Sequence, residues 1–378
     1  MSEVSKYQKF NTPVYIYSKD QLSANYKLLE ASFPYQHMQI HYAVMCNNNK
    51  DVLREIRKLG GSVQVNSLNE LELVKDIGFD KRCISFTSIG LDKDSLRHLI
   101  NEGVQLNLDS IEEVEKLCQL TSNYSFGIRV NIKDDIILNK DHTNSYKHSD
   151  VGIKEEDFKR VTQIARQASC KINGVHGYLA SNILDTVPCM KFGDYLGRCA
   201  SSFKDLEYLN FGSGFGVFCE CKTKHFDFET IGRHYANITE DLSTNFNRDI
   251  QLKIEPGRSI VASAGILLAK VTNIKQLQDK KQVAIDVGFG GFARPILYNA
   301  CHLIEVLGKE NGAEHYDVRA ATVLQSDFIG RDRYLPLIEE NDIVVIHNAG
   351  AYGMVMASGF PGRKKPEEIM ITSFADLL

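Results

Sequence analysis

Eight short apolar segments alternate with segments of helical periodicity, and this alternation constrains the fold more than any other feature of the sequence. The apolar segments are HYAV at His41, SVQV at Ser62, CISF at Cys83, QLNL at Gln105, FGIRV at Phe126, NGVHGYL at Asn173, YLNF at Tyr208 and LKIE at Leu252. Helical segments such as KDVLREIRKLG and LNELELVKDIG lie between them and end at glycine, as helices often do. Eight strand-then-helix units predict a (βα)8 barrel rather than an open doubly wound sheet.

The pattern changes after Gly265 to strand-like segments separated by short polar turns. These segments are LLAKVTNIKQ, QVAIDVG, VRAATVL, DIVVIH and EEIMIT, and they predict a second, mostly β domain. A further strand, TPVYIYS, precedes the first helix and could pair with that β domain. We therefore expect an α/β fold with a barrel over residues 25–265 and a C-terminal β domain built from residues 1–24 and 266–378.

Charge and composition limit the partners of this chain. The net charge is -4 and the lysines and arginines are scattered, so neither nucleic acid nor a membrane surface is an expected partner. The nine cysteines lack paired CxxC spacing, which argues against a metal site. The opening segment MSEVSKYQKF has no apolar core of the kind that export signals carry. The sequence predicts a reduced, cytoplasmic setting.

Two glycine-containing motifs follow the seventh and eighth predicted strands. GSGFG spans residues 212–216, and EPGR spans residues 255–258. In a barrel of this kind, phosphate groups bind near the loops after these two strands. Glycine lets the backbone approach a phosphate closely, and an arginine beside the loop adds a charged contact. A tight turn would explain GSGFG alone equally well, so only the two motifs together indicate a phosphate site.

These motifs, with others in the same order, resemble those of the fold-type-III pyridoxal-phosphate decarboxylases that act on diaminopimelate, ornithine and similar amino acids. The matching segments are TPVYIY, YAVMCNNN, NSLNEL, IRVN, GVHGYLAS, GSGFG, EPGRSIVASAG, IDVGFGGFARPILYNACH, SDFIGRDRYLP and NAGAYGMVMAS. They extend over nearly the whole chain. The resemblance implies a barrel with a C-terminal β domain, pyridoxal phosphate as the ancestral cofactor, and a head-to-tail homodimer whose active sites are shared between subunits.

The resemblance also assigns binding roles to individual residues. The phosphate cradle would consist of Gly212, Ser213, Gly214, Gly216, Gly257 and Arg258. Glu255 would pair with the pyridine nitrogen and keep the ring protonated, and Tyr352 would reach the phosphate from the other subunit. Arg294 and Tyr298 match contacts to a substrate carboxylate. Asp327 matches an acidic residue that meets the distal end of the substrate, although it could instead be a solvated loop charge paired with Arg331 or Arg333.

Three catalytic positions depart from the family pattern. Met45 stands where the family has the lysine that links the cofactor covalently, and a thioether has no amine. Met45 is expected to fill the base of the barrel as a core residue. Tyr178 replaces the imidazole that stacks on the cofactor ring, and Val323 replaces the cysteine that protonates the product. Several changes together favour natural divergence over a single engineered loss of the lysine.

Two functions are compatible with this pattern. One is a carbon–carbon lyase with slow or altered chemistry on a small amino acid that is diaminopimelate-like or an N-acylated diamino acid. The other is a pseudoenzyme that binds a phosphorylated ligand or pairs with an active homologue. Lys50 begins the next helix and is not expected to replace the missing lysine, and Cys46 is expected to pack as a small apolar residue.

Overall fold

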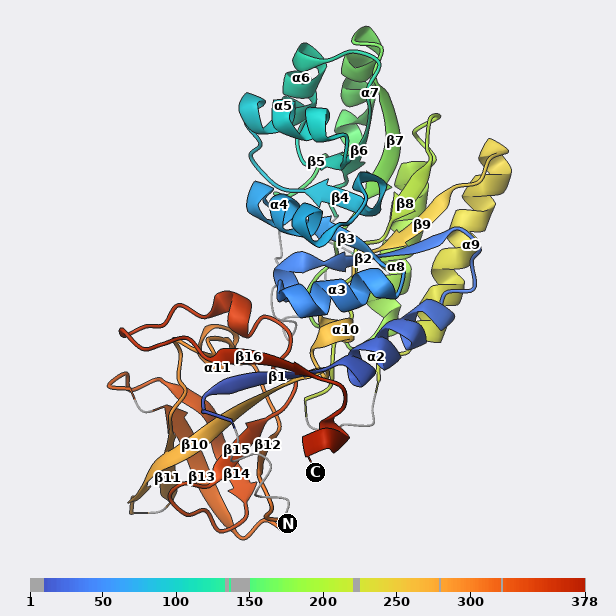
Figure 1. The fold of residues 1–378 in the computed structure, drawn as a ribbon. Coiled ribbons are helices and arrows are strands. Elements are labelled where there is room, and N and C mark those ends of the chain that lie inside the picture. Colours follow the sequence, from blue (N-terminus) through green and yellow to red (C-terminus); the bar gives the residue numbers. More distant parts are fainter. Residues whose placement is uncertain are drawn as a thin grey trace.

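A closed barrel of eight parallel strands is followed by a mostly β part in this computed structural model (Figure 1). The structure describes residues 10–132, 136, 150–219, 225–278, 280–320 and 322–377. The barrel strands are β2 (Met38–Ala43), β3 (Ser62–Val65), β4 (Ile84–Thr87), β5 (Gln105–Leu108), β6 (Ser125–Arg129), β7 (Lys171–His176), β8 (Tyr208–Asn210) and β9 (Gln251–Ile254). Each of the eight predicted segments contributes one strand, so the predicted barrel is confirmed.

Helices alternate with the barrel strands along the chain, and each of those named below except α7 begins at a side chain that caps it. They are α2 (Lys19–Ala31), α3 (Lys50–Lys58), α4 (Leu68–Ile77), α5 (Lys93–Glu102), α6 (Ile111–Leu120), α7 (Phe158–Gln167), α8 (Thr186–Ala200) and α9 (Phe228–Phe246). At α4, the Ser67 hydroxyl accepts from the Glu70 N–H at 3.2 Å, and the Glu70 carboxylate accepts from the Asn66 N–H at 2.7 Å. These reciprocal bonds satisfy N–H groups that a helix start leaves unpaired. The helix ends at Gly78, which adopts a left-handed conformation with a φ of 92°.

The interior of the barrel is polar, whereas branched apolar side chains usually fill this space. The Tyr208 hydroxyl donates to Asn107 Oδ1 at 2.7 Å, and Asn107 Nδ2 donates to Thr87 Oγ1 at 2.9 Å. Below them, Lys253 Nζ donates to Gln105 Oε1 at 2.7 Å and lies 4.6 Å from the centre of the Tyr208 ring. Because these polar groups are paired with one another, their burial is compensated.

The mostly β part contains strands from both ends of the chain. Strand β1 (Val14–Ser18) pairs antiparallel with β10 (Gly265–Gln276) and parallel with β16 (Glu367–Ile371). The other strands are β11 (Lys281–Ile285), β12 (Ile304–Val306), β13 (Glu314–Ala320), β14 (Phe328–Leu335) and β15 (Ile343–Ile346). The pairing expected for TPVYIYS is therefore confirmed, while β12 and β14 were not predicted. The exact division at residues 25–265 stays a prediction, which the pairing of β1 supports.

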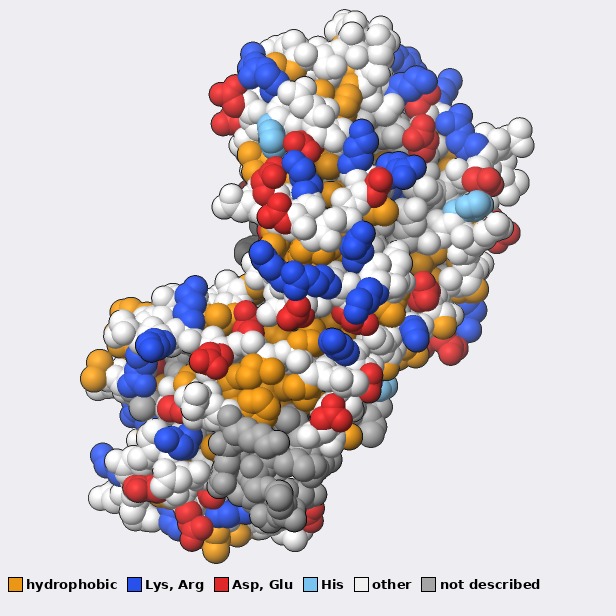
Figure 2. Space-filling view, viewed as in Figure 1, with side chains coloured by type: hydrophobic (Ala, Val, Ile, Leu, Met, Phe, Trp, Pro, Cys, Tyr) orange, Lys and Arg blue, Asp and Glu red, His pale blue; other side chains and the backbone are white. Residues whose placement is uncertain are grey.

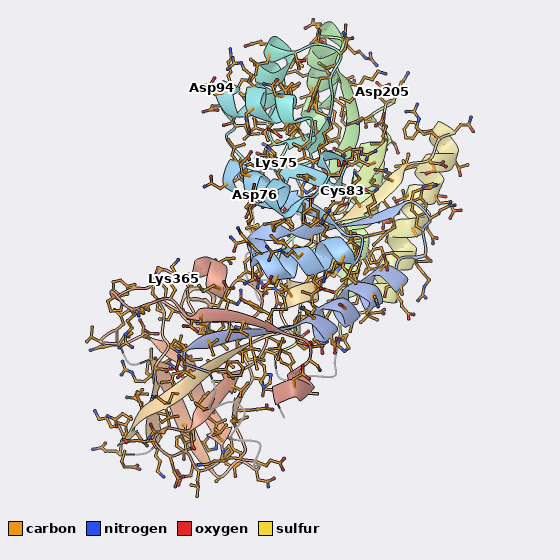
Figure 3. All side chains as sticks on the ribbon, in the orientation of Figure 1. Lys75, Asp76, Cys83, Asp94, Asp205 and Lys365 are labelled. Carbon is orange, nitrogen blue, oxygen red and sulfur yellow. A yellow bond between two sulfur atoms is a disulfide. The ribbon has the colours of Figure 1, made fainter. Side chains whose placement is uncertain are left out.

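Charged side chains of both signs alternate over the face of the molecule shown in Figure 2, which agrees with the small net charge. On the outer face of the barrel, Lys75 of α4 pairs with Glu72 at 3.1 Å and with Glu102 at 2.8 Å (Figure 3). Within the described part of the chain, no helix is both long enough and apolar enough to cross a bilayer.

Two glycines of the barrel wall make room for the Tyr208 ring, and this packing can be tested. A Cβ at Gly174 or at Gly127 would overlap Tyr208. We expect Gly174→Ala to lower the free energy of unfolding by about 1–3 kcal/mol, since overpacking of a filled interior costs that much. Urea denaturation measures the effect, with Ser125→Ala, an exposed position on β6, as the control that leaves stability nearly unchanged. Equal midpoints for wild type and Gly174→Ala would contradict this packing.

Candidate active site

A cavity of about 970 Å³ lies at the C-terminal ends of the barrel strands, in the size range of small-molecule sites. The end of β2, the end of β7 and the segment after β9 line it, as do residues of the β part. It brings together most residues that the sequence singled out: Met45, Tyr178, Ser213, Gly214, Glu255, Gly257, Arg258, Arg294, Tyr298 and Tyr352. Segments far apart in the sequence therefore meet in one place.

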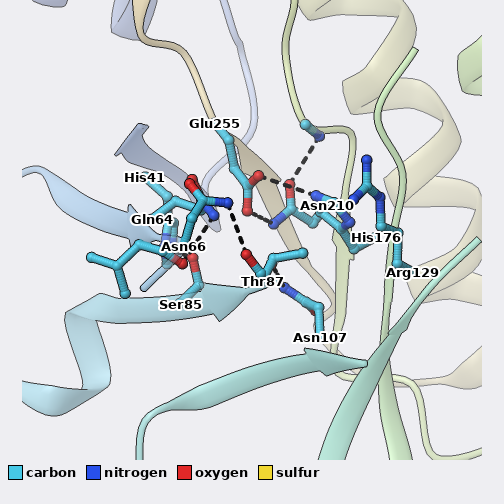
Figure 4. Close-up of polar contacts among 12 residues, drawn as sticks. His41, Gln64, Asn66, Ser85, Thr87, Asn107, Arg129, His176, Asn210 and Glu255 are labelled. Atoms are coloured by element: carbon cyan, nitrogen blue, oxygen red, sulfur yellow. Dashed lines mark hydrogen bonds and ion pairs between the residues drawn. The ribbon is translucent and has the colours of Figure 1, made fainter. Parts of the chain in front are cut away.

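Glu255 lies at the floor of this cavity and is held by two neighbouring strand ends (Figure 4). His176 Nε2 lies 3.1 Å from Glu255 Oε2, and Asn210 Nδ2 donates to Glu255 Oε1 at 2.7 Å. Burial alone would raise the pKa of Glu255, but the neighbouring imidazole and these hydrogen bonds more than offset it, so the pKa lies below its usual value. The carboxylate is therefore kept ionised and can accept a hydrogen bond from a ligand.

Sequence reasoning gave no role to His176 or Asn210, although both contact Glu255 directly. His176 ends β7 and Asn210 ends β8. Polar residues at the last position of a barrel strand face the active site in this fold, so their positions were a signal that could have been used.

The GSGFG loop follows β8 and depends on glycine at two positions. Gly212 and Gly214 have φ values of 57° and 105°, and a Cβ at Gly214 would overlap the carbonyl oxygen of Ala180. Ile183 fixes the loop, because its N–H donates to the Gly214 carbonyl and its carbonyl accepts from the Gly216 N–H, both at 2.8 Å. Among described residues, the N–H groups of Ser213 and Gly214 have no acceptor, and both residues line the cavity. Gly212 and Gly216 belong to the same loop but do not line the cavity.

Two arginines approach the ring of Tyr352 at the β-domain side of the cavity. The guanidinium of Arg258 lies 5.1 Å from the ring centre, and that of Arg294 lies 5.9 Å from it. Within the described ranges, neither arginine has a carboxylate partner. Arg294 is only 8% exposed, and burial together with the charge of Arg258 lowers its pKa to about 10. Buried cations without counter-charges are costly, so this end of the cavity is suited to an anion.

Tyr352 corrects one expectation from the sequence. It was expected to reach a phosphate in the other subunit, but the structure places it in the cavity of its own chain. Its N–H donates to the carbonyl of Cys46 at 2.8 Å, which fixes the position of the ring.

Met45 also differs from expectation. It was predicted to fill the base of the barrel, but it lies in a short 3-10 helix (Val44–Cys46) after β2, and it is 46% exposed and lines the cavity. The backbone turns in this 3-10 helix, and the Met45 side chain faces the space of the cavity.

Neighbouring Cys46 is buried as predicted and packs against Gly257, and burial raises the pKa of its thiol to about 12. Lys50 is exposed at the start of α3, and no lysine lines the cavity among the residues the structure describes.

The remaining predicted residues differ in their surroundings. Tyr178 lines the cavity, and its hydroxyl is 2.6 Å from Ser181 Oγ. Val323 is 92% exposed and lies outside the cavity. Asp327 is 1% exposed and accepts from Thr322 Oγ1 at 2.6 Å and from the Phe289 N–H at 3.0 Å. The alternative of a solvated loop charge is therefore wrong for Asp327, while its contact with a substrate stays a prediction.

Comparison with known proteins gives one consistent result. A family model described as pyridoxal-dependent decarboxylase, pyridoxal binding domain, matches residues 19–262. The diaminopimelate decarboxylase of Methanothermobacter thermautotrophicus is 27% identical over 377 residues, covering 96% of this chain and 87% of that protein. That of Neisseria meningitidis serogroup A is 28% identical over 375 residues, covering 96% and 90%. A crystal structure of diaminopimelate decarboxylase from Helicobacter pylori complexed with L-lysine has a TM-score of 0.89 at 25% identity, covering 98% of this chain and 94% of that chain.

The contacts of Glu255 predict a pH-dependent contribution to stability. Its pKa in the folded protein is depressed below 4.5, so the stabilisation is present above that pH and is lost as pH falls through the folded value. We expect Glu255→Gln to lower the free energy of unfolding at neutral pH by about 2 kcal/mol, the usual worth of hydrogen bonds to a charged group. The difference in the free energy of unfolding between wild type and Glu255→Gln should become smaller at acid pH. Denaturant titrations at several pH values measure this difference, with exposed Glu229→Gln as the control. A stability difference that became larger in acid would contradict the lowered pKa of Glu255.

Proposed function

This chain belongs to the family of pyridoxal-dependent decarboxylases, and from this membership we propose that it binds pyridoxal phosphate without a covalent link. We further propose that it is a carbon–carbon lyase with slow or altered chemistry on an amino acid that carries an additional carboxylate. The observation on which this depends most is the pair of arginines, Arg258 and Arg294, that contact Tyr352 without any carboxylate partner in the described ranges. Such a pair can bind a phosphate and a substrate carboxylate side by side.

The described residues fit this cofactor at both of its polar ends. The N–H groups of Ser213 and Gly214, which have no acceptor among the described residues, would hold the phosphate together with Arg258. The ionised carboxylate of Glu255 would accept a hydrogen bond from the pyridine nitrogen. When bound, pyridoxal phosphate supplies an electron-accepting ring that stabilises the negative charge left by departing carbon dioxide.

The chemistry around the reacting end would differ from that of the family. Met45 provides an apolar wall and no amine, so the cofactor would be held by non-covalent contacts alone. Val323 cannot donate a proton to the product. We propose that Tyr178 supplies this proton, because burial raises the pKa of its phenol and keeps it protonated. The weaker acid and the missing amine are the physical reasons to expect slow turnover.

Substrate choice would depend on Arg294 and Tyr298, which lie on the short helix α11 (Arg294–Tyr298) at the cavity wall. The guanidinium of Arg294 lies 5.9 Å from the centre of the Tyr298 ring, and its Nε is buried without a partner among described residues. A carboxylate at this position would satisfy that donor. The relatives named diaminopimelate decarboxylase support a diaminopimelate-like or N-acylated diamino acid substrate.

A pseudoenzyme is the second candidate, and the exposure of Met45 in the cavity favours it. In that case the cavity would keep a phosphorylated ligand but perform no chemistry. We also propose a head-to-tail homodimer, or a mixed dimer with an active homologue. The support for a dimer is Val323, a 92% exposed apolar residue at the position that the family uses across its subunit interface.

Covalent capture of the cofactor distinguishes these possibilities. We expect wild type to bind pyridoxal phosphate in a visible-absorption titration but to retain none after borohydride reduction. Met45→Lys should gain a reducible link, seen by mass spectrometry as a phosphopyridoxyl group on residue 45, because its amine would lie where Met45 lines the cavity. Met45→Arg, which adds charge but no reactive amine, is the control. Failure of both proteins to take up the cofactor would contradict the proposed binding function.

If wild type binds the cofactor and releases carbon dioxide from an added amino acid, the lyase is supported. If it binds the cofactor but releases none from any dicarboxylic diamino acid tested, the pseudoenzyme is supported.

The two arginines are expected to act on different ligand groups. Arg258→Gln should weaken pyridoxal phosphate binding about tenfold or more, since it removes a charge-assisted contact of about 1.5–3 kcal/mol. Arg294→Gln should leave that affinity nearly unchanged but weaken the binding of the amino acid. Fluorescence titrations with pyridoxal phosphate and then with diaminopimelate measure both, with exposed Arg331→Gln as the control. If both substitutions weakened the affinity for pyridoxal phosphate equally, the two arginines would form a single anion site.

A further inference from the structure

Two cysteines from distant parts of the chain meet in the wall of the cavity. Cys219 and Cys301 are separated by 82 residues, yet their Cα atoms lie 5.8 Å apart and their sulfur atoms are bonded. Both line the cavity and both are partly exposed. The sequence predicted reduced cysteines, so this pair is a correction that only the fold could reveal.

The disulfide connects the two segments that carry the proposed ligand contacts. Cys219 follows the GSGFG loop, and Cys301 follows α11, which carries Arg294 and Tyr298. A hydrogen bond of 3.4 Å from Asn348 Nδ2 to the Phe218 carbonyl joins the same loop to the segment after β15, and it is long and weak. The disulfide is a covalent connection between the GSGFG loop region and the segment that follows α11.

The surroundings of Cys301 make its sulfur the better leaving group of the pair. Arg333 Nη2 lies 3.6 Å from Cys301 Sγ, within hydrogen-bonding distance for sulfur. The Nε of Arg333 is buried without a partner, and no carboxylate in the described residues neutralises this arginine. An adjacent unpaired guanidinium stabilises a thiolate and increases the reactivity of the cysteine. No arginine contact of this kind is found for Cys219 within the described ranges.

We propose that Cys219 and Cys301 form a thiol–disulfide exchange site that controls how long the cavity retains its ligand. In reduction, a thiolate of a small dithiol attacks Cys219 Sγ, the S–S bond breaks, and Cys301 leaves as a thiolate beside Arg333. The second thiol of the reagent then attacks the mixed disulfide and releases Cys219. The protein gains two electrons and two protons, and the dithiol becomes a cyclic disulfide. A small disulfide such as oxidised glutathione drives the reverse reaction.

The bond fixes the GSGFG loop relative to α11, so it opposes any opening of the cavity between them. Reduction removes this covalent restraint. Ligand exchange should then be faster, as it is wherever opening of a loop limits release. Retention of ligand by this bond depends on the proposed cofactor function, whereas the thiol chemistry does not.

Thiol mapping on the full-length protein tests the chemistry independently of any ligand. After equilibration with oxidised glutathione, we expect tryptic digestion without reductant to yield a linked peptide pair containing Cys219 and Cys301, which dithiothreitol abolishes. Cys221→Ser, at a position outside the described residues, should leave this link in place. Separate alkylation of Cys219 and Cys301 under oxidising conditions, with no linked pair, would overturn the proposal.

Alkylation rates of the reduced protein test the role of Arg333. Iodoacetamide should modify Cys301 faster than Cys118, whose thiol is an internal control with a pKa raised to about 12 by burial. Arg333→Gln should slow modification of Cys301 about tenfold, and Arg333→Lys should restore part of the rate because it keeps the charge. An unchanged rate in both variants would remove Arg333 from the site.

Stopped-flow release of pyridoxal phosphate from oxidised and reduced protein then tests ligand retention. Release should be several-fold faster after reduction, and Cys301→Ser should release at the reduced rate under both conditions. A linked pair with equal release rates would overturn the retention role while leaving the exchange site intact. Absence of any bound pyridoxal phosphate, with the linked pair present, would instead count against the proposed cofactor function.

Discussion

The pairing of β2 with β9 closes the barrel, and every contact of the site depends on it. Ile40 aligns with Ile254 in this pairing, and the Ala43 N–H then donates to the Pro256 carbonyl at 3.1 Å. The segment after β2, which carries Met45, is thereby placed against the EPGR segment after β9. Closure leaves no free strand edge and gathers all eight strand ends into one ring. The cavity is the space inside that ring, completed by the β part.

Charge within this ring is distributed unevenly, and this is what suggests a ligand. Glu255 at the floor is satisfied by His176 and Asn210, so its charge is already stabilised by the protein. Arg258 and Arg294 contact the ring of Tyr352, and Arg294 also the ring of Tyr298, but neither has a carboxylate partner in the described part of the chain. Burying an unpaired cation is costly, and a folded protein tolerates it where an anion can later compensate. The site is therefore arranged for a ligand that is anionic at one end and a hydrogen-bond donor at the other.

Met45 combines a position at the cavity with a side chain of limited reactivity. The backbone turns at this residue in a short 3-10 helix, and the side chain lines the cavity. A thioether there can pack against a ligand but cannot bond to it. Covalent attachment, rather than overall affinity, is therefore the property that tests the proposed function most directly.

The sequence by itself determined the barrel, the β part, and most of the residues that line the cavity. These follow from local patterns: strand and helix periodicity sets the order of the elements, and barrel closure places each strand end at the active site. It could not place Met45 or Tyr352 correctly or decide between the two alternatives for Asp327, because their surroundings depend on how one segment turns relative to another. It also gave no sign of the bond between Cys219 and Cys301, whose 82-residue separation has no local signature. Only the tertiary structure decided these points, since they rest on distances between segments that the chain order does not fix.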